Sequence, residues 1–188
     1  MSLELLKQSL LEAPVVKKKD YWYVVHPITD GVPEINPALL SEIANEMYKR
    51  IKECGEIDKI VTIEAMGIPI ATALSQKMNL PFNIIRKRSY GLTGEVNIKQ
   101  VTGYSKSELF INGLKKGDKI VIVDDVLSTG GTLKAVVSKI NEIDVDIKGV
   151  FIAINKGDIV KNILKNFKID LNILVTIKVE DGKVRIIS

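Results

Sequence analysis

Short, continuously apolar segments alternate with segments of helical periodicity along most of this 188-residue chain. Four apolar segments have the length and β-branched content of buried strands: KIVTIE (59–64), FNIIR (82–86), KIVIVDD (119–125) and KGVFIAIN (148–155). Helical spacing is found in GIPIATALSQKMN (67–79) and TLKAVVSKINE (132–142). Strands that are apolar on both faces need helices on both sides of their sheet. We therefore predict an α/β protein with a central, mostly parallel sheet flanked by helices.

The other segments predict the remaining elements. An amphipathic helix is expected over 3–11, a strand over 21–28, an ordered loop over 29–37, a helix from 37 to about 55, and a hairpin within 173–188. One polar, Gly-containing stretch of about 20 residues, between Lys87 and Ser107, shows little periodicity. A stretch of that length in a compact domain is more often a functional flap than an idle linker, so we expect a flexible loop over about 88–107.

Composition and charge limit the possible functions. With 46% hydrophobic and 27% charged residues, 188 residues suit one domain with one core. The net charge is +4, but acidic and basic residues are interleaved, which disfavours a nucleic-acid partner and suits a phosphate-rich small substrate. The single Cys54 excludes an internal disulfide, and the first 16 residues carry charges inside their apolar pattern, unlike a signal peptide. A cytoplasmic location without membrane contact is expected.

The stretch VIVDDVLSTGGT (121–132) carries the clearest chemistry. In an open parallel sheet, ligands bind beyond the carboxyl ends of the strands, where Asp124 and Asp125 are expected to emerge. The residues that follow supply hydroxyls, small side chains and a helix N-terminus, which together form a cradle for an anion: Ser128, Thr129, Gly130, Gly131 and Thr132. Carboxylates repel phosphate but accept hydrogen bonds from vicinal hydroxyls. The stretch therefore predicts a site for a sugar phosphate, and it is neither a Walker A loop nor a dinucleotide fingerprint.

This stretch resembles the 5-phosphoribosyl 1-diphosphate (PRPP) motif of type I phosphoribosyltransferases. The order and lengths of the segments from about Tyr21 onward are most similar to the archaeal hypoxanthine/guanine phosphoribosyltransferases. The resemblance implies the type I fold, with a small hood contributed by about 15–36 and the C-terminal region. In this reading Asp124 and Asp125 are catalytic and hold the ribose, while residues 128–132 hold its 5′-phosphate.

Three further segments are similar to parts of the same family. IEAMGIP (63–69) resembles the pyrophosphate loop, which assigns Glu64, Ala65, Met66 and Gly67 to that site, although adenine enzymes have Arg where Met66 stands. IIRKRSYG resembles the next strand end, where Arg86 and Lys87 would face the diphosphate. A solvated basic strand end is the alternative for this pair. TGYSKSELFI resembles the flexible loop and the strand after it, with Tyr104 as a catalytic residue and Ser105 and Lys106 beside it.

Lys156 follows an apolar strand at the place where 6-oxopurine enzymes of the family have a Lys that donates to the O6 carbonyl. An ammonium has only donors, so it suits a carbonyl and disfavours the exocyclic amine of adenine. An exposed Lys without a role is the alternative. The lone His26 has no visible partner and is expected to be a packing or hydrogen-bonding residue at a strand end. Tyr21, Trp22 and Tyr23 could stack on a purine but are more often core residues.

The resemblance implies an enzyme that transfers the phosphoribosyl group from PRPP to N9 of hypoxanthine or guanine, giving IMP or GMP and pyrophosphate in purine salvage. It also implies Mg²⁺ carried mainly by PRPP, with no metal ligands assigned in the protein, and a homodimer. Two alternatives remain open: an adenine phosphoribosyltransferase, and a regulator that senses PRPP without catalysis. The sequence does not rank hypoxanthine, guanine and xanthine. It also leaves open which hood residues contact the base and which group would protonate N7, because Ser128 cannot act as an acid.

Overall fold

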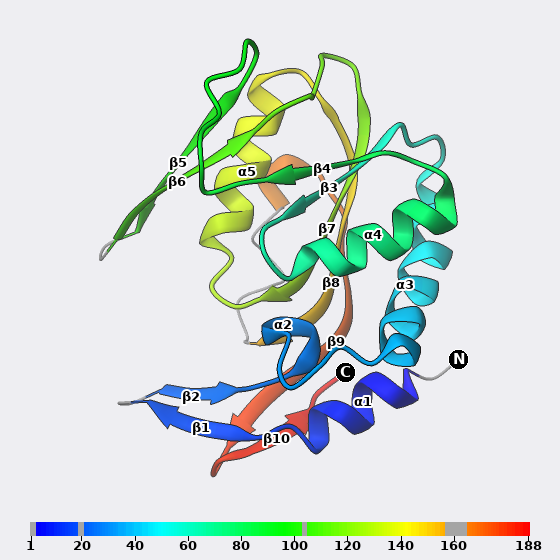
Figure 1. Cartoon of the computed structure of the whole chain (residues 1–188), viewed down its shortest axis with the longest axis vertical. Coiled ribbons are helices and arrows are strands. Elements are labelled where there is room, and N and C mark those ends of the chain that lie inside the picture. The colour runs from blue at the N-terminus through cyan, green and yellow to red at the C-terminus, as the bar shows by residue number, and fades with distance from the viewer. Residues whose placement is uncertain (1–2, 19–20, 103–104, 157–164) are drawn as a thin grey trace.

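The computed structural model describes residues 3–18, 21–102, 105–156 and 165–188 (Figure 1). Its centre is a six-stranded sheet with the strand order β10-β9-β8-β7-β3-β4. The strands are β3 (Lys59–Ile63), β4 (Phe82–Ile85), β7 (Lys119–Leu127), β8 (Asp146–Lys156), β9 (Leu171–Glu180) and β10 (Lys183–Ile186). Neighbouring strands are parallel except β9 and β10, which form the antiparallel hairpin expected at the C-terminal end. The α/β class and the mostly parallel sheet are confirmed.

Helices cover both faces of this sheet, as the continuous apolar strands require. One face packs against α1 (Glu4–Leu11), α3 (Pro37–Ile51) and α4 (Gly67–Met78). The other face packs against α5 (Gly131–Glu142). Alternate residues of β7 serve the two cores: Val121 and Val123 face the first, and Ile120 and Ile122 face the second. Among the residues that the structure describes, no helix combines the length and apolarity needed to cross a bilayer.

The predicted flap region contains more regular structure than its sequence indicated. Strands β5 (Val96–Thr102) and β6 (Ser105–Ile111) form a two-stranded antiparallel ribbon beside α5. Ile98, Leu109 and Ile111 are buried, so the apolar residues follow the strand period of two rather than a helical period. About half of the segment is therefore strand, which its low periodicity did not indicate, and the flexible loop over about 88–107 stays a prediction. Tyr104, which falls between β5 and β6 in the sequence, lies outside the described residues, as do the side chains of Ser105 and Lys106.

The expected hood segment forms a small layer below the sheet in Figure 1. It contains a β1 (Val15–Lys18) and β2 (Tyr21–Val24) hairpin followed by the one-turn helix α2 (Pro27–Asp30). The predicted strand over 21–28 is thus shorter than expected, because Pro27 removes a backbone donor and starts a helix. The C-terminal turn joins this layer: a Cβ at Gly182 would lie 3.5 Å from the Trp22 ring.

His26 ties the hood to the N-terminal helix. Its side chain is fully buried, with Nδ1 accepting from the Ile28 backbone N at 3.2 Å and Nε2 lying 2.9 Å from Ser9 Oγ. Ser9 Oγ donates to the Leu6 carbonyl at 3.0 Å, so it can accept from an Nε2–H. These bonds suit the neutral imidazole, and the expectation of a hydrogen-bonding residue is confirmed. Glu42 of α3 holds the same helix by accepting from the backbone N of Leu5 at 3.2 Å and Leu6 at 2.9 Å.

Acid should weaken this junction. Burial and then the charge of Lys156 lower the pKa of His26 from 6.5 to about 4, although Asp30 opposes the shift. Between these pH values the unfolded chain binds more protons at His26, so stability is complete above pH 6.5 and falls as the pH approaches 4. The loss amounts to about 3 kcal/mol at most. Asn in place of His26 can still cap α2 but does not titrate. The free energy of unfolding, measured with urea at several pH values, should therefore fall less in acid for His26→Asn than for the parent chain. An equal fall in both chains would contradict this account.

Candidate active site

The carboxyl end of β7 brings together the two acids and the glycine turn. The strand continues to Leu127, two residues beyond the predicted KIVIVDD strand, so Asp124 and Asp125 lie within its last four residues. Parallel pairing with β8 extends through Leu127 and keeps the backbone straight at this point. The turn that follows reaches Gly130 with a positive φ of 73°, and α5 begins at Gly131. Beside this turn lies a cavity of about 140 Å³, lined in part by Asp124, Ser128, Thr129, Gly130 and Thr132. The predicted cradle residues thus gather around one hollow.

The two carboxyl groups occupy a poorly solvated place. Asp125 is only 7% exposed, and Asp124 is half-buried at the wall of the cavity. Burial raises the pKa of both groups, and the negative charge of Asp125 raises that of Asp124 further. The side chains are in hydrogen-bonding contact with each other, while the ammonium of Lys156 favours the ionised form of Asp125. A ligand that donates hydrogen bonds from hydroxyl groups would therefore stabilise the ionised form of this pair.

Gly67 makes the closest approach to this pair. A Cβ at Gly67 would lie 2.1 Å from Thr62 Oγ1 and 2.5 Å from Asp124 Oδ1, distances that no larger residue can satisfy without displacing its neighbours. Thr62 Oγ1 is buried and has no hydrogen-bond partner in the described part of the chain. Because Gly67 is the first residue of α4, the N-terminus of that helix reaches the acid pair. The predicted pyrophosphate segment therefore lies next to the predicted ribose site.

Glu64 organises the neighbouring strand end. Its Oε1 accepts from the Lys87 backbone N at 2.7 Å, and its Oε2 lies 2.6 Å from Arg86 Nε in an ion pair whose N–H does not point at the oxygen. The peptide bond between Glu64 and Ala65 is cis. Glu64 thus offsets the charge of Arg86, whereas the exposed Lys87 side chain has no partner among the described residues. Of the two basic residues, Lys87 has the freer charge for an anionic ligand.

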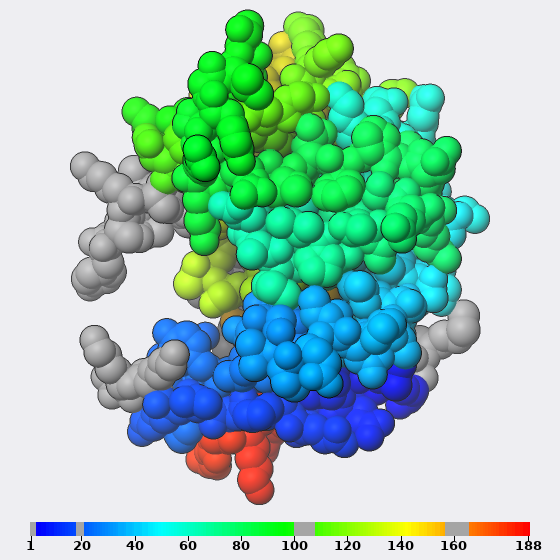
Figure 2. Space-filling model, viewed as in Figure 1, coloured from blue at the N-terminus to red at the C-terminus, as the bar shows by residue number. Residues whose placement is uncertain are grey.

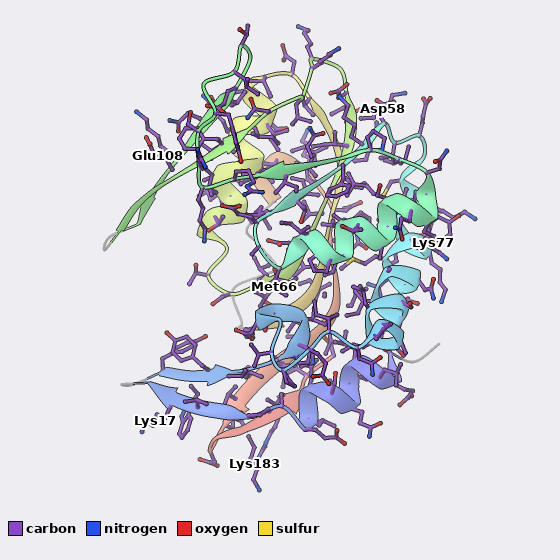
Figure 3. The ribbon with its side chains drawn as sticks, viewed as in Figure 1. Lys17, Asp58, Met66, Lys77, Glu108 and Lys183 are labelled. Carbon is purple, nitrogen blue, oxygen red and sulfur yellow. The ribbon has the colours of Figure 1, made fainter. Side chains whose placement is uncertain are left out.

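Met66 points toward the hood. A Cβ at Gly31, the C-cap of α2, would lie 3.5 Å from Met66 Cε and 3.6 Å from its Sδ. Figure 3 shows the labelled Met66 side chain just above α2, between the sheet and the hood. Gly31 has a φ of 70°, a conformation that favours glycine. The side chain at position 66 therefore bridges two parts of the site by an apolar contact.

Lys156 ends β8 at the same edge of the sheet. Its Nζ donates to the Val24 carbonyl at 3.4 Å, and its side chain lines a cavity of about 230 Å³ together with Tyr21, Trp22 and residues of β9. Burial lowers the pKa of Lys156, while Asp30 and Asp125 raise it. Tyr21 and Tyr23 pack edge to face with 4.7 Å between their ring centres, and both are exposed. The interpretation of these tyrosines as core residues was therefore wrong.

The surface is hollowed where these groups meet. In Figure 2 the hollow lies between the green ribbon and the blue hood, and yellow-green atoms from around residue 130 lie at its inner end. Three residues near it were missed by sequence reasoning: Asp30, Gly31 and Thr62. Asp30-Gly31 carried a turn signal, but Thr62 carried none, since it lies inside an apolar strand. Among the described residues, no three His, Cys, Asp or Glu side chains gather as metal ligands, and Mg²⁺ carried by a substrate stays a prediction.

A family model described as "Phosphoribosyl transferase domain" matches residues 34–181. The chain belongs to this family. It is 50% identical over 186 residues to a hypoxanthine/guanine phosphoribosyltransferase of Methanothermus fervidus, covering 99% of this chain and 98% of that one. It is 52% identical over 185 residues to the enzyme of the same name from Methanobacterium lacus, covering 97% and 95% of the two chains. The resemblance seen in the sequence motifs is confirmed.

Solved structures of the family share the fold. Adenine phosphoribosyltransferase from Saccharomyces cerevisiae superposes with a TM-score of 0.75 at 20% identity, covering 92% of this chain and 97% of that one. The enzyme of the same name from Leishmania tarentolae gives 0.74 at 15% identity, covering 94% and 88%. At these identities the likeness concerns the fold alone, and it confirms the type I architecture.

The buried carboxylates of this site should lower the stability of the folded chain at neutral pH. An Asp whose pKa is raised in the folded state destabilises that state once the pH exceeds its unfolded pKa, and the cost is complete above its folded pKa. Asp125→Asn should therefore raise the free energy of unfolding by about 1–2 kcal/mol at pH 7.5, with a smaller gain near pH 4. Thermal unfolding at both pH values measures this. Asp144→Asn, which changes an exposed carboxylate paired with Lys116, is the control and should have little effect. A loss of stability in Asp125→Asn would contradict the interpretation.

Proposed function

We propose that this chain transfers the 5-phosphoribosyl group from PRPP to N9 of hypoxanthine or guanine, releasing IMP or GMP and pyrophosphate in purine salvage. The observation that carries the proposal is the cradle of residues 128–132 beside the acid pair of β7, with Lys156 at the end of the adjacent strand. Relatives about half identical over nearly the whole chain bear the name hypoxanthine/guanine phosphoribosyltransferase, which supports the 6-oxopurine. The adenine enzymes among the solved structures are too distant to favour adenine.

The cradle holds the 5′-phosphate in this proposal. Backbone N–H groups of the turn and the N-terminus of α5 point positive ends of dipoles at the anion, and the hydroxyls of Ser128, Thr129 and Thr132 add donors. The two ribose hydroxyls donate to Asp124 and Asp125 and replace the contact between the carboxyl groups. Their negative charge then favours the positive charge that develops on the ribose as the C1′–diphosphate bond breaks.

The leaving diphosphate lies on the other side of the ribose. Lys87 and the backbone at Ala65, Met66 and Gly67 bind it, because the N-terminus of α4 reaches this place and its first residue has no side chain to obstruct an anion. Glu64 and Arg86 position the two loops through their ion pair. Mg²⁺ bound to PRPP neutralises part of the diphosphate charge. The predicted flexible loop with Tyr104, Ser105 and Lys106 excludes water from the reacting ribose in this proposal.

The base is bound at the hood side, where Lys156 donates to the C6 carbonyl. The lowered pKa of Lys156 reflects partial burial, and a buried donor without a matching acceptor is penalised, so the site rejects an amine at C6. The hood is formed by about 15–36 with the C-terminal region, and the loop over about 88–107 closes the site. We also propose a cytoplasmic location and a homodimer. Light scattering would measure the mass of the assembly and so test the dimer.

Incubation with PRPP, Mg²⁺ and one base at a time tests the function. Pyrophosphate should be released with hypoxanthine and with guanine, at least about 100-fold faster than with adenine at equal concentration, because only the 6-oxopurines offer an acceptor to Lys156. Release with adenine alone would support an adenine transferase. A chain that binds PRPP but releases pyrophosphate with none of the bases would be a PRPP sensor.

Lys156→Gln separates base recognition from PRPP binding. The amide keeps a donor but loses the charge and length, so KM for hypoxanthine should rise roughly tenfold or more while KM for PRPP changes less than about twofold. Steady-state kinetics with each substrate varied in turn measures both. Asp125→Asn is the matched opposite, with weaker PRPP binding and little change toward the base. An equal loss for both substrates in Lys156→Gln would reject its role in base recognition.

A further inference from the structure

The hood helix α2 carries a carboxylate for which the proposed mechanism has no role. Asp30 is the last residue of α2, which lies against β7 just below the carboxyl edge of the sheet (Figure 1). Its Oδ2 accepts from the His26 backbone N at 2.9 Å and from Thr29 Oγ1 at 2.6 Å. Within the described part of the chain, its other oxygen has no hydrogen-bond partner, and the residue is exposed. One half of this carboxylate is therefore fixed, and the other half is available.

The surroundings of Asp30 place it at the centre of the site. A Cβ on the residue after it, Gly31, would lie 3.5 Å from Met66 Cε of the predicted pyrophosphate loop. The carboxylate acts on two groups at the ends of neighbouring strands: it raises the pKa of Asp125 on β7 and of Lys156 on β8. Of the two carboxylates that act on Lys156, Asp30 has the larger effect. The geometry also brings Asp30 toward Lys156, because the ammonium donates to the Val24 carbonyl, and His26, two residues further on, donates its backbone N–H to Asp30.

Asp30 favours the charged form of Lys156 without forming an ion pair with it. Among the described residues, their side chains form no ion pair within 4.0 Å, and the ammonium donates to the Val24 carbonyl instead. An acceptor and a donor that lie in one region without pairing suit a planar ligand whose edge offers one donor and one acceptor side by side.

The 6-oxopurines have that edge and adenine has its reverse. In hypoxanthine and guanine the C6 carbonyl accepts and the adjacent ring N1–H donates. In adenine the C6 amine donates and the bare N1 accepts. A carboxylate beside an ammonium therefore matches the first pattern at both atoms and opposes the second at both.

We propose that Asp30 is a specificity residue for the base: its free oxygen accepts the N1–H of hypoxanthine or guanine while Lys156 donates to the neighbouring carbonyl. This inference rests on the proposed function and adds a second residue, from the hood, to the recognition of the base. The fixed Oδ2 presents the acceptor in one orientation, so little side-chain freedom is lost when the base binds.

Asp30→Asn tests this with almost no change of shape. The amide oxygen can keep the bonds from His26 and Thr29, while the free position changes from an acceptor to an NH₂ donor. KM for hypoxanthine and guanine should rise roughly 10- to 100-fold, KM for PRPP should stay within about twofold, and the preference over adenine should narrow by a similar factor. The melting temperature should change little because the bonds within α2 are retained.

Glu34→Gln is the matched control. It removes a carboxylate from the same hood segment, but Glu34 lines a groove facing α1 and α3, away from Lys156, so all of these constants should stay near those of the parent chain. If the parent chain uses hypoxanthine and Asp30→Asn has an unchanged KM for it, the role of Asp30 is rejected and the transferase stands. Equal losses for base and PRPP with a lower melting temperature would show a structural role and also reject it. If the parent chain itself fails with both 6-oxopurines, the proposed function fails first.

Discussion

Two carboxyl groups lie in contact at the end of β7, where the surrounding side chains keep most water away. Water would stabilise their charges, and so would donors, but Asp124 and Asp125 have mainly each other and the more distant Lys156. Such an arrangement persists only because the two packed cores on either side of β7 fix the strand. Gly67 lies against the same pair, as does the Thr62 hydroxyl, which has no hydrogen-bond partner among the described residues, and both observations support the ligand site that we propose here.

Much of the fold could be predicted because the local signals agree with the tertiary structure. Apolar strands alternate with capped helices, and Asn36 caps α3 through bonds from Ala38 and Leu39, as its position before Pro37 indicated. The ribbon of β5 and β6 was missed because its apolar residues are spread among polar ones. Its stability depends on packing against α5, which the local sequence does not reveal.

The site could be predicted in part for a related reason. Residues 124–132 are contiguous in the sequence, so their combined chemistry could be predicted from one short motif. The interactions that organise the rest join distant segments: the ion pair of Glu64 with Arg86, the approach of Met66 to Gly31, and the packing of α2, which ends at Asp30, against β7. None of these pairs is close in sequence, and each depends on the strand order of the sheet. The carboxyl end of β7 lies two residues beyond the predicted one, because an Asp pair indicates the end of a strand when the parallel partner that continues it is not known.

The N-terminal helix α1 supports the hood, a role that its own sequence does not indicate. It is fastened to α3 by Glu42 and to the hood by Ser9 and His26, and His26 in turn begins the helix that ends at Asp30. Removal of the N-terminal helix would take away the Ser9 hydroxyl that binds the buried His26 imidazole. The hood helix α2, which His26 caps, would then be held less firmly beside the proposed base site. Expression tags and truncations at this terminus can therefore affect the proposed base site through the hood, even though α1 itself lies well apart from the start of α5 in Figure 1.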